Sequence, residues 1–237
     1  MPSTRLGRVV RALSPFLALV LAAELVDTSA CPAACRPVLG ILVVGADRYC
    51  RAVCDNASHA SLAALMWHSV APSWPSIWGC SESRAFVRER MLAFACGSLL
   101  DLDHFLRAHS LSLADATYPS PVRPPGHALV AVPVFAVAVA CALQAAAGKE
   151  RSKQRYWRAV ILVMCALASH QLRDATRRGL WLWPLQLSTA PLGRNAYRAA
   201  LVALALTARV ALAFAVRDSG DAHRDRPEAV AQPGLEV

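Results

Sequence analysis

The chain has 237 residues, of which 56% are hydrophobic and 17% are charged, and its formal net charge is +9. Soluble globular domains carry about 25% charged residues, so this composition argues against an ordinary soluble protein. The basic residues are scattered between apolar blocks, which is typical of anchoring to lipid headgroups and argues against a nucleic-acid-binding protein. We therefore predict an all-α, polytopic transmembrane helical bundle with about five or six spans.

The N-terminal region has the pattern of a signal sequence. Three arginines precede an apolar segment at residues 13–26, and small residues follow it. The acidic residues at the end of this segment, Glu24 and Asp27, fit a cleavage region poorly. We expect the segment to be retained as a first helix, and a cleaved signal peptide is the alternative.

Further apolar segments follow along the chain. The predicted spans cover residues 56–71, 86–105, 127–147, 156–172 and 196–216. The segment at 127–147 contains no Asp, Glu, Lys or Arg and is long enough to cross a bilayer core of about 30 Å. The predicted organisation is an N-terminal membrane segment and loop (1–54), a helical bundle (55–216) and a disordered tail (217–237).

Lysine and arginine are enriched on one side of this predicted arrangement, and the densest group lies in residues 149–158. Basic loops favour the cytoplasmic side of a membrane. We therefore predict a multi-pass membrane protein with both termini in the cytoplasm.

Histidine and aspartate residues border several of the apolar segments. The set consists of Asp55, His59, Asp101, Asp103, His104, His127, His170 and Asp174. Two pairs in this set are four residues apart, so the members of each pair share one face of a helix. Because successive spans alternate in direction, every member is expected at the same, non-cytoplasmic surface.

Imidazole and carboxylate groups suit Zn²⁺, Mn²⁺ or Fe²⁺, and metal sites in helical bundles are built from such pairs on facing helices. The pattern therefore favours a divalent-metal site. A proton or ion relay would use the same residues. Aspartate, asparagine and histidine also occur as helix caps and interface residues, so a purely structural role is a third interpretation.

The order and spacing of several motifs are distinctive. They are Asp55-Asn56-x-x-His59, Asp101-x-Asp103-His104-Phe105, Ser110-Leu111-Ser112-Leu113, Arg123-Pro124 before His127, Ser169-His170-x-x-Arg173-Asp174 and Arg178-Gly179-Leu180-Trp181. In these motifs the chain resembles the transmembrane protein 267 family, and the resemblance implies residence in a membrane. Pro125-Gly126 replace a bulky apolar pair of that family, so the chain departs from the pattern immediately before His127.

More distantly, the order His…Asp-x-Asp-His…His…His-x-x-x-Asp is similar to bacterial membrane-bound, metal-dependent hydrolases of the LexA-regulated type. This resemblance implies metal binding by a set of residues at the matching positions. The set is His59, Asp101, Asp103, His104, His127, His170 and Asp174.

We therefore predict a metal-dependent hydrolase that acts at the membrane surface on a lipid-like or phosphorylated substrate. The expected metal ligands, for Zn, Mn or Fe, are His59, Asp101, His127 and His170. The expected general base or partner of a ligand is one of Asp103, His104 and Asp174. Arg173 and Arg178 are expected to orient an anionic substrate.

The alternative is a non-enzymatic structural or partner-binding membrane protein, whose histidines and aspartates cap and tie helices. In either case the expected partner is the lipid bilayer and not nucleic acid.

Overall fold

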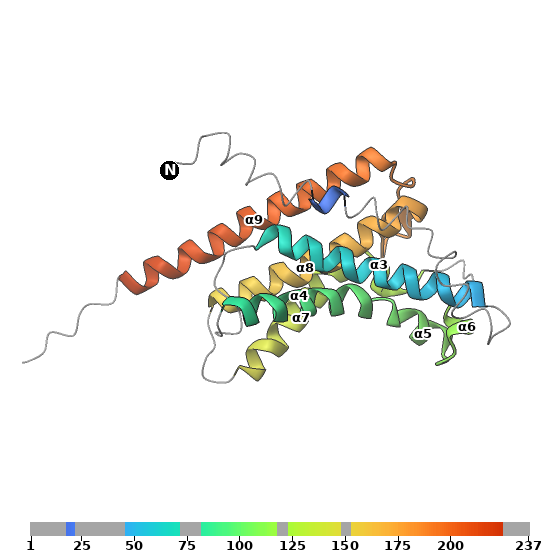
Figure 1. The fold of residues 1–237 in the computed structure, drawn as a ribbon, viewed down its shortest axis with the longest axis horizontal. Coiled ribbons are helices and arrows are strands. Elements are labelled where there is room, and N and C mark those ends of the chain that lie inside the picture. Colours follow the sequence, from blue (N-terminus) through green and yellow to red (C-terminus); the bar gives the residue numbers. More distant parts are fainter. Residues whose placement is uncertain (1–17, 22–45, 72–81, 118–122, 148–152, 225–237) are drawn as a thin grey trace, which may run out of the picture.

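The computed structural model describes residues 18–21, 46–71, 82–117, 123–147 and 153–224 (Figure 1). The described part of the chain is predominantly helical. Its elements are α3 (Ala46–Val70), α4 (Glu82–Leu99), α5 (Leu102–Ala108), α6 (Leu113–Ala116), the 3₁₀ turn η1 (Pro125–His127), α7 (Ala131–Ala146), α8 (Lys153–Arg178), β1 (Trp181–Leu182), β2 (Leu187–Ser188) and α9 (Arg194–Arg224). The two short strands pair antiparallel in a hairpin between α8 and α9.

Helix α8 is the central helix, and it contacts α3, α4, α7 and α9. Its apolar middle, residues 159–167, is buried at every position but Met164, because neighbouring helices cover it on several sides. Helices α3 and α4 approach each other closely at Gly97, where an added Cβ would lie 2.6 Å from the Cβ of Ala63. The close approach thus requires glycine at this position.

A buried ion pair joins α3, α4 and α8. The Glu89 carboxylate accepts hydrogen bonds from Arg158 Nε and Nη2, at 2.9 and 2.7 Å, and from Trp67 Nε1 at 2.9 Å. Glu89 and Arg158 are 2% and 4% exposed, so both charges depend on each other for compensation.

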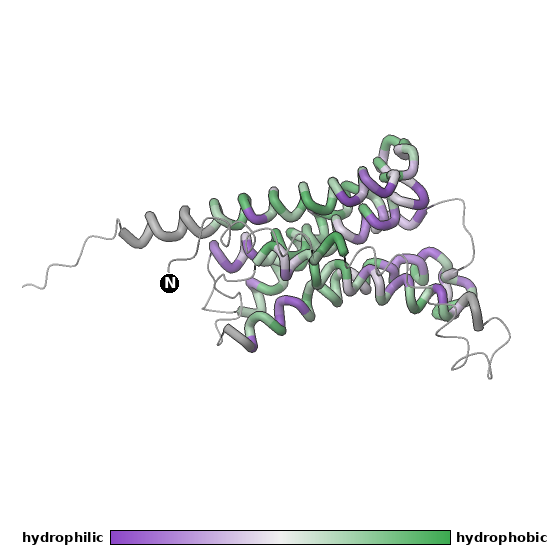
Figure 2. Tube along the Cα trace, turned by 45° about the horizontal axis from the view of Figure 1, so that its top comes forward, coloured by the Kyte–Doolittle hydropathy of each residue, from purple (hydrophilic) through white to green (hydrophobic). Residues whose placement is uncertain are grey.

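The prediction of five or six spanning helices is wrong. Among the described residues, one helix is long and apolar enough to cross a membrane, α9 over Arg194–Ala215. Figure 2 shows that the described part of α9 is largely hydrophobic, and Leu206, Val210 and Phe214 on it are exposed. Helix α7 is apolar but has 16 residues, fewer than the roughly 20 that a span needs.

The error has a physical cause. The apolar residues of α3, α4 and α8 form a protein core, in which they are buried against one another and not against lipid. The same helices carry charged residues within their length, as at Glu89 and Arg90 in α4. Hydropathy alone does not distinguish a helix buried in a protein core from a membrane span.

Several other predictions are covered only in part by the described residues, or not at all. The predicted first helix is described only at residues 18–21, which are helical and place Leu19 in the core. Helix α9 continues to Arg224, beyond the predicted end of the last span at residue 216. The three-part division of the chain and the side of the membrane on which the termini lie stay predictions.

Candidate metal centre

The histidines and aspartates predicted to form a metal site come together at one end of the bundle. His59 lies on α3, Asp101 in the turn between α4 and α5, Asp103 and His104 on α5, His127 on η1, and His170 and Asp174 on α8. Three overlapping triplets have potential ligand atoms within 4.8 Å of one another. They are His59, Asp101 and His170; Asp101, His104 and His127; and His127, His170 and Asp174.

Four potential ligand atoms in this cluster lie close together. His127 Nε2 is 3.4 Å from Asp101 Oδ1 and 3.4 Å from Asp174 Oδ2. His170 Nε2 is 3.4 Å from Asp101 Oδ1, 3.8 Å from Asp174 Oδ2 and 3.4 Å from His127 Nε2. Metal–ligand bonds of about 2.0–2.2 Å in a tetrahedron separate the ligand atoms by roughly 3.3–3.6 Å. The mutual distances of 3.4 Å among Asp101 Oδ1, His127 Nε2 and His170 Nε2 therefore match ligands around a zinc-sized ion, and Asp174 Oδ2 lies close to both nitrogens.

The two central imidazoles are oriented by hydrogen bonds at their other nitrogen. His170 Nδ1 lies 2.8 Å from the Gly97 carbonyl oxygen, to which it donates a hydrogen bond. His127 Nδ1 lies 3.0 Å from Asp103 Oδ2 and donates to that carboxylate. In both rings Nε2 then points toward the other ligand atoms. Metal-binding histidines characteristically have such an acceptor at the second ring nitrogen.

His59 supports this group from α3. Its ring stacks on that of His170, with the ring centroids 3.7 Å apart. Its Nε2 is 3.3 Å from Asp174 Oδ1, whereas the other oxygen of that carboxylate, Oδ2, lies 3.4 Å from His127 Nε2. His59 Nδ1 is buried and has no hydrogen-bond partner among the described residues.

Asn56 on α3 also contacts the candidate metal centre, although the sequence pattern alone gave it no role there. Asn56 Nδ2 donates to Asp101 Oδ2 at 3.1 Å and to the Ser98 carbonyl oxygen at 2.9 Å. This leaves Asp101 Oδ1 facing the two imidazoles. Asn56 lies three residues before His59 and therefore on the same helix face, which is a signal that the sequence did contain.

Helix capping does not explain Asp101. The residue occupies the N-cap position of α5, but its side chain makes no capping hydrogen bond. Its carboxylate contacts Asn56, His127 and His170 instead.

The charges in the cluster favour a bound cation. Burial alone would raise the pKa of Asp101 and Asp174, but the neighbouring imidazoles hold both pKa values well below their usual range. Burial alone would lower the pKa of His127, but hydrogen bonds with Asp101 and Asp103 raise it to about 10. Burial, together with repulsion from His170, lowers the pKa of His59. The carboxylates therefore stay ionised and stabilise positive charge between them.

The two arginines predicted to bind substrate lie in different surroundings. Arg173 is 5% exposed and pairs with Asp55, with 2.6 Å between Nη1 and Oδ1. Arg177 binds the same carboxylate, with 2.7 Å between Nη1 and Oδ2. Arg178 instead lines a small cavity beside the candidate ligands, together with His104, Arg123, Pro124, His127, Gln171 and Asp174.

The unusual Pro125-Gly126 pair has a local reason. Residues Pro125–His127 form η1, and the His127 backbone N–H donates to the Pro124 carbonyl oxygen at 3.0 Å. A Cβ at Gly126 would lie 2.4 Å from Asp103 Oδ2. Glycine at this position therefore leaves room for the carboxylate that orients His127.

Curated relatives match more than half of the chain. Transmembrane protein 267 of Mus musculus is 34% identical over 170 residues, which are 67% of this chain and 73% of the mouse protein. The chain belongs to the transmembrane protein 267 family. The proteins of that name from Danio rerio and Xenopus laevis are each 33% identical over 142 residues, or 60% of this chain. The matched regions cover 58% and 60% of those two proteins, less than two thirds of their length.

The resemblance stated from the motifs is thus confirmed. No protein-family model and no solved structure matches the chain. Membership of a family of transmembrane proteins supports a membrane location. Among the described helices, α9 has the length and composition to cross a membrane.

Proposed function

We propose that this protein is a divalent-metal-dependent hydrolase that acts at a membrane surface on a lipid-like or phosphorylated substrate. One observation carries the proposal. The Nε2 atoms of His127 and His170 lie 3.4 Å apart, and each is 3.4 to 3.8 Å from a carboxylate oxygen of Asp101 and of Asp174, while a hydrogen bond donated by Nδ1 orients each imidazole.

The donor set favours zinc over manganese or iron. A set of four donors, two imidazole nitrogens and two carboxylate oxygens, suits Zn²⁺, whereas Mn²⁺ and Fe²⁺ usually take more ligands. The ligands are Asp101, His127, His170 and Asp174. The sequence suggested His59 as the fourth ligand, and we assign Asp174 instead. Asp174 Oδ2 approaches the imidazoles of His127 and His170, whereas His59 contacts the other oxygen of Asp174, Oδ1.

The residues around the ligands supply the other parts of a hydrolytic site. If bound by these four residues, such an ion would need to take a water or substrate oxygen as a fifth ligand, and it would then polarise a phosphoryl or carbonyl oxygen or lower the pKa of the water. His104 lines the small cavity beside Asp174 and acts as the proton acceptor there. Arg178 lines the same cavity and orients an anionic group of the substrate. Asp103 keeps the His127 ring in position.

The site lies close to the point at which the chain enters the membrane. The start of α9 is tied to the end of α8 by a hydrogen bond from the Leu192 backbone N–H to the Ala175 carbonyl oxygen, at 2.8 Å. His170 and Asp174 occupy the same end of α8. The intervening hairpin exposes Trp183, Leu185 and Leu187, at 46%, 68% and 57%. Exposed aromatic and apolar side chains of this kind suit a membrane–water interface, which is where lipid headgroups lie.

Elemental analysis of the full chain, purified in detergent and dialysed against chelator-treated buffer, tests the proposal. We expect about one zinc per chain in the wild type. The double variant Asp101→Asn/Asp174→Asn preserves side-chain shape and removes both anionic ligands, so it should lose the metal.

The matched control is Asp115→Asn, which changes an exposed aspartate that accepts a hydrogen bond from Ser110 Oγ. This control should keep the metal, and circular dichroism should show equal helix content in all three proteins. Absence of metal from the wild type after zinc, manganese and iron supplementation refutes the hydrolase and favours the alternative, in which the cluster only ties helices together.

A further inference from the structure

A large apolar groove, distinct from the small cavity that Arg178 lines, lies next to the candidate metal centre. It has a volume of about 820 Å³ and is formed by α4, α5, η1, α7 and α8. Its apolar part is lined by residues that include Leu100, Phe135, Val139 and Leu167. Sites for small organic ligands commonly have volumes of about 300–1,000 Å³, so this groove is large enough for one long ligand.

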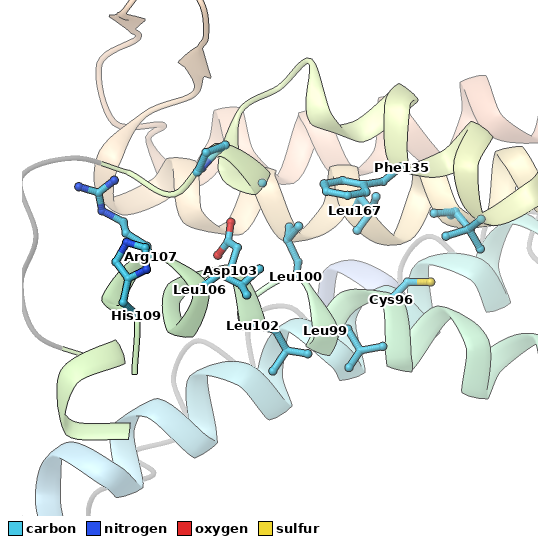
Figure 3. Close-up of a pocket in the computed structure, with 14 residues that line it drawn as sticks. Cys96, Leu99, Leu100, Leu102, Asp103, Leu106, Arg107, His109, Phe135 and Leu167 are labelled. Carbon is cyan, nitrogen blue, oxygen red and sulfur yellow. The ribbon is translucent and has the colours of Figure 1, made fainter. Parts of the chain in front are cut away.

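One end of this groove is polar. Figure 3 shows Arg107 and His109 together at one end, Phe135 and Leu167 toward the other, and Asp103 between them. A cationic end and an apolar remainder are complementary to an amphiphile that has an anionic headgroup and a hydrocarbon chain.

The groove and the metal centre share a wall. Asp103 lines the groove, and its Oδ2 accepts the hydrogen bond from His127 Nδ1 at 3.0 Å. Gly126 also lines the groove, next to His127 in η1. A molecule in the groove is therefore separated from a candidate ligand by one side chain.

The groove is also accessible from the outside of the bundle. Leu99, Leu102 and Phe135 line it and are 56%, 51% and 44% exposed. Apolar side chains that are exposed at the mouth of an apolar groove permit entry of a hydrocarbon chain from outside the bundle.

We infer that this groove binds one acyl chain of an anionic lipid, with the lipid headgroup at Arg107 and His109 and the chain running past Asp103 (Figure 3), which also contacts His127 of the metal centre. The inference rests on the proposed function in that it names the substrate class of the same site. Lipid binding itself can be measured without any enzymatic activity.

The test uses the full chain in nanodiscs of phosphatidylcholine that contain a trace of phosphatidic acid with a photoreactive diazirine on one acyl chain. After illumination, mass spectrometry locates the cross-links. We expect them to concentrate on α4 and α7 residues of the groove. Val139→Trp places a large ring at the wall of the groove and should reduce these cross-links about tenfold, since the ring occupies space that the acyl chain needs.

The matched control is Val137→Trp, which makes the same change on the same helix at a residue that is 44% exposed and does not line the groove. It should leave the cross-links unchanged. Arg107→Gln should reduce labelling by phosphatidic acid but not by a photoreactive phosphatidylcholine with the same chains. Cross-links spread equally over the exposed faces of α7 and α9 in every variant would overturn the inference.

Metal content, measured on the same samples, separates the two proposals. A labelled groove in a wild-type protein without metal supports the lipid site and refutes the proposed function. A bound metal without labelling of the groove refutes the lipid site alone.

Discussion

Replacement of Asp103 by asparagine tests whether the cluster is built to hold a metal. Asp103 Oδ2 accepts a hydrogen bond from His127 Nδ1 at 3.0 Å, and the side chain is 15% exposed. Asparagine has nearly the same shape, so it keeps the contact with Gly126 and can still accept from the imidazole. It loses the negative charge that makes His127 a stronger ligand.

The expected magnitude follows from this role. Loss of an acceptor behind a metal-binding histidine typically costs about 10- to 100-fold in metal affinity. This corresponds to about 1.4 to 2.7 kcal/mol of binding free energy. Loss of a direct ligand should cost more, so Asp103→Asn is expected to fall between the wild type and His170→Ala.

Competition with a chromophoric zinc chelator measures this affinity on the detergent-purified chain. Asp115→Asn, at an exposed position on α6, again serves as the control and should bind zinc as the wild type does. If Asp103→Asn remains folded and binds zinc within about twofold of the wild type, Asp103 does not support a ligand, and the orientation argument for His127 is refuted.

Three further predictions concern the same structure. Gly126→Ala places a Cβ 2.4 Å from Asp103 Oδ2 and should weaken zinc binding about as much as Asp103→Asn in the same competition assay. Glu89→Gln removes the charge that compensates buried Arg158 and should lower the free energy of unfolding by about 3 kcal/mol; an unchanged denaturation midpoint contradicts this. Although burial opposes it, the neighbouring carboxylates raise the pKa of His127 to about 10, so below that pH zinc must displace a proton. Binding should release about one proton at pH 7, and affinity should rise about tenfold per pH unit. Calorimetry of zinc binding in buffers of different ionisation enthalpy measures this proton release. A binding enthalpy that is the same in every buffer contradicts the prediction.

Much of the candidate site was accessible from sequence, because its signals are local. His170 and Asp174 are four residues apart on one helix, and Asp101, Asp103 and His104 lie within four consecutive positions. The alternation of helix direction then indicated a common end. The same reasoning did not assign Asn56, whose role depends on the approach of α3 to the turn after α4.

The positions of individual atoms depended on contacts between distant segments. Arg173 and Arg178 are both expected from sequence to orient an anionic substrate, yet Arg173 pairs with Asp55 on α3, while Arg178 lines the small cavity. Whether Asp174 or His59 contributes the fourth donor likewise depends on how α3 packs against α8. No local pattern specifies such distances.

The sequence by itself determined that the chain is helical, that it belongs with transmembrane proteins, and which residue types gather at one end of the bundle. Only the tertiary structure decided the number of helices able to span a membrane. Apolar side chains lose contact with water equally well in lipid and in a protein core, so composition does not reveal which of the two covers them. In the described residues the apolar faces of α3, α4 and α8 cover one another. The largely apolar α9, with exposed Leu206, Val210 and Phe214, is the described helix suited to face lipid.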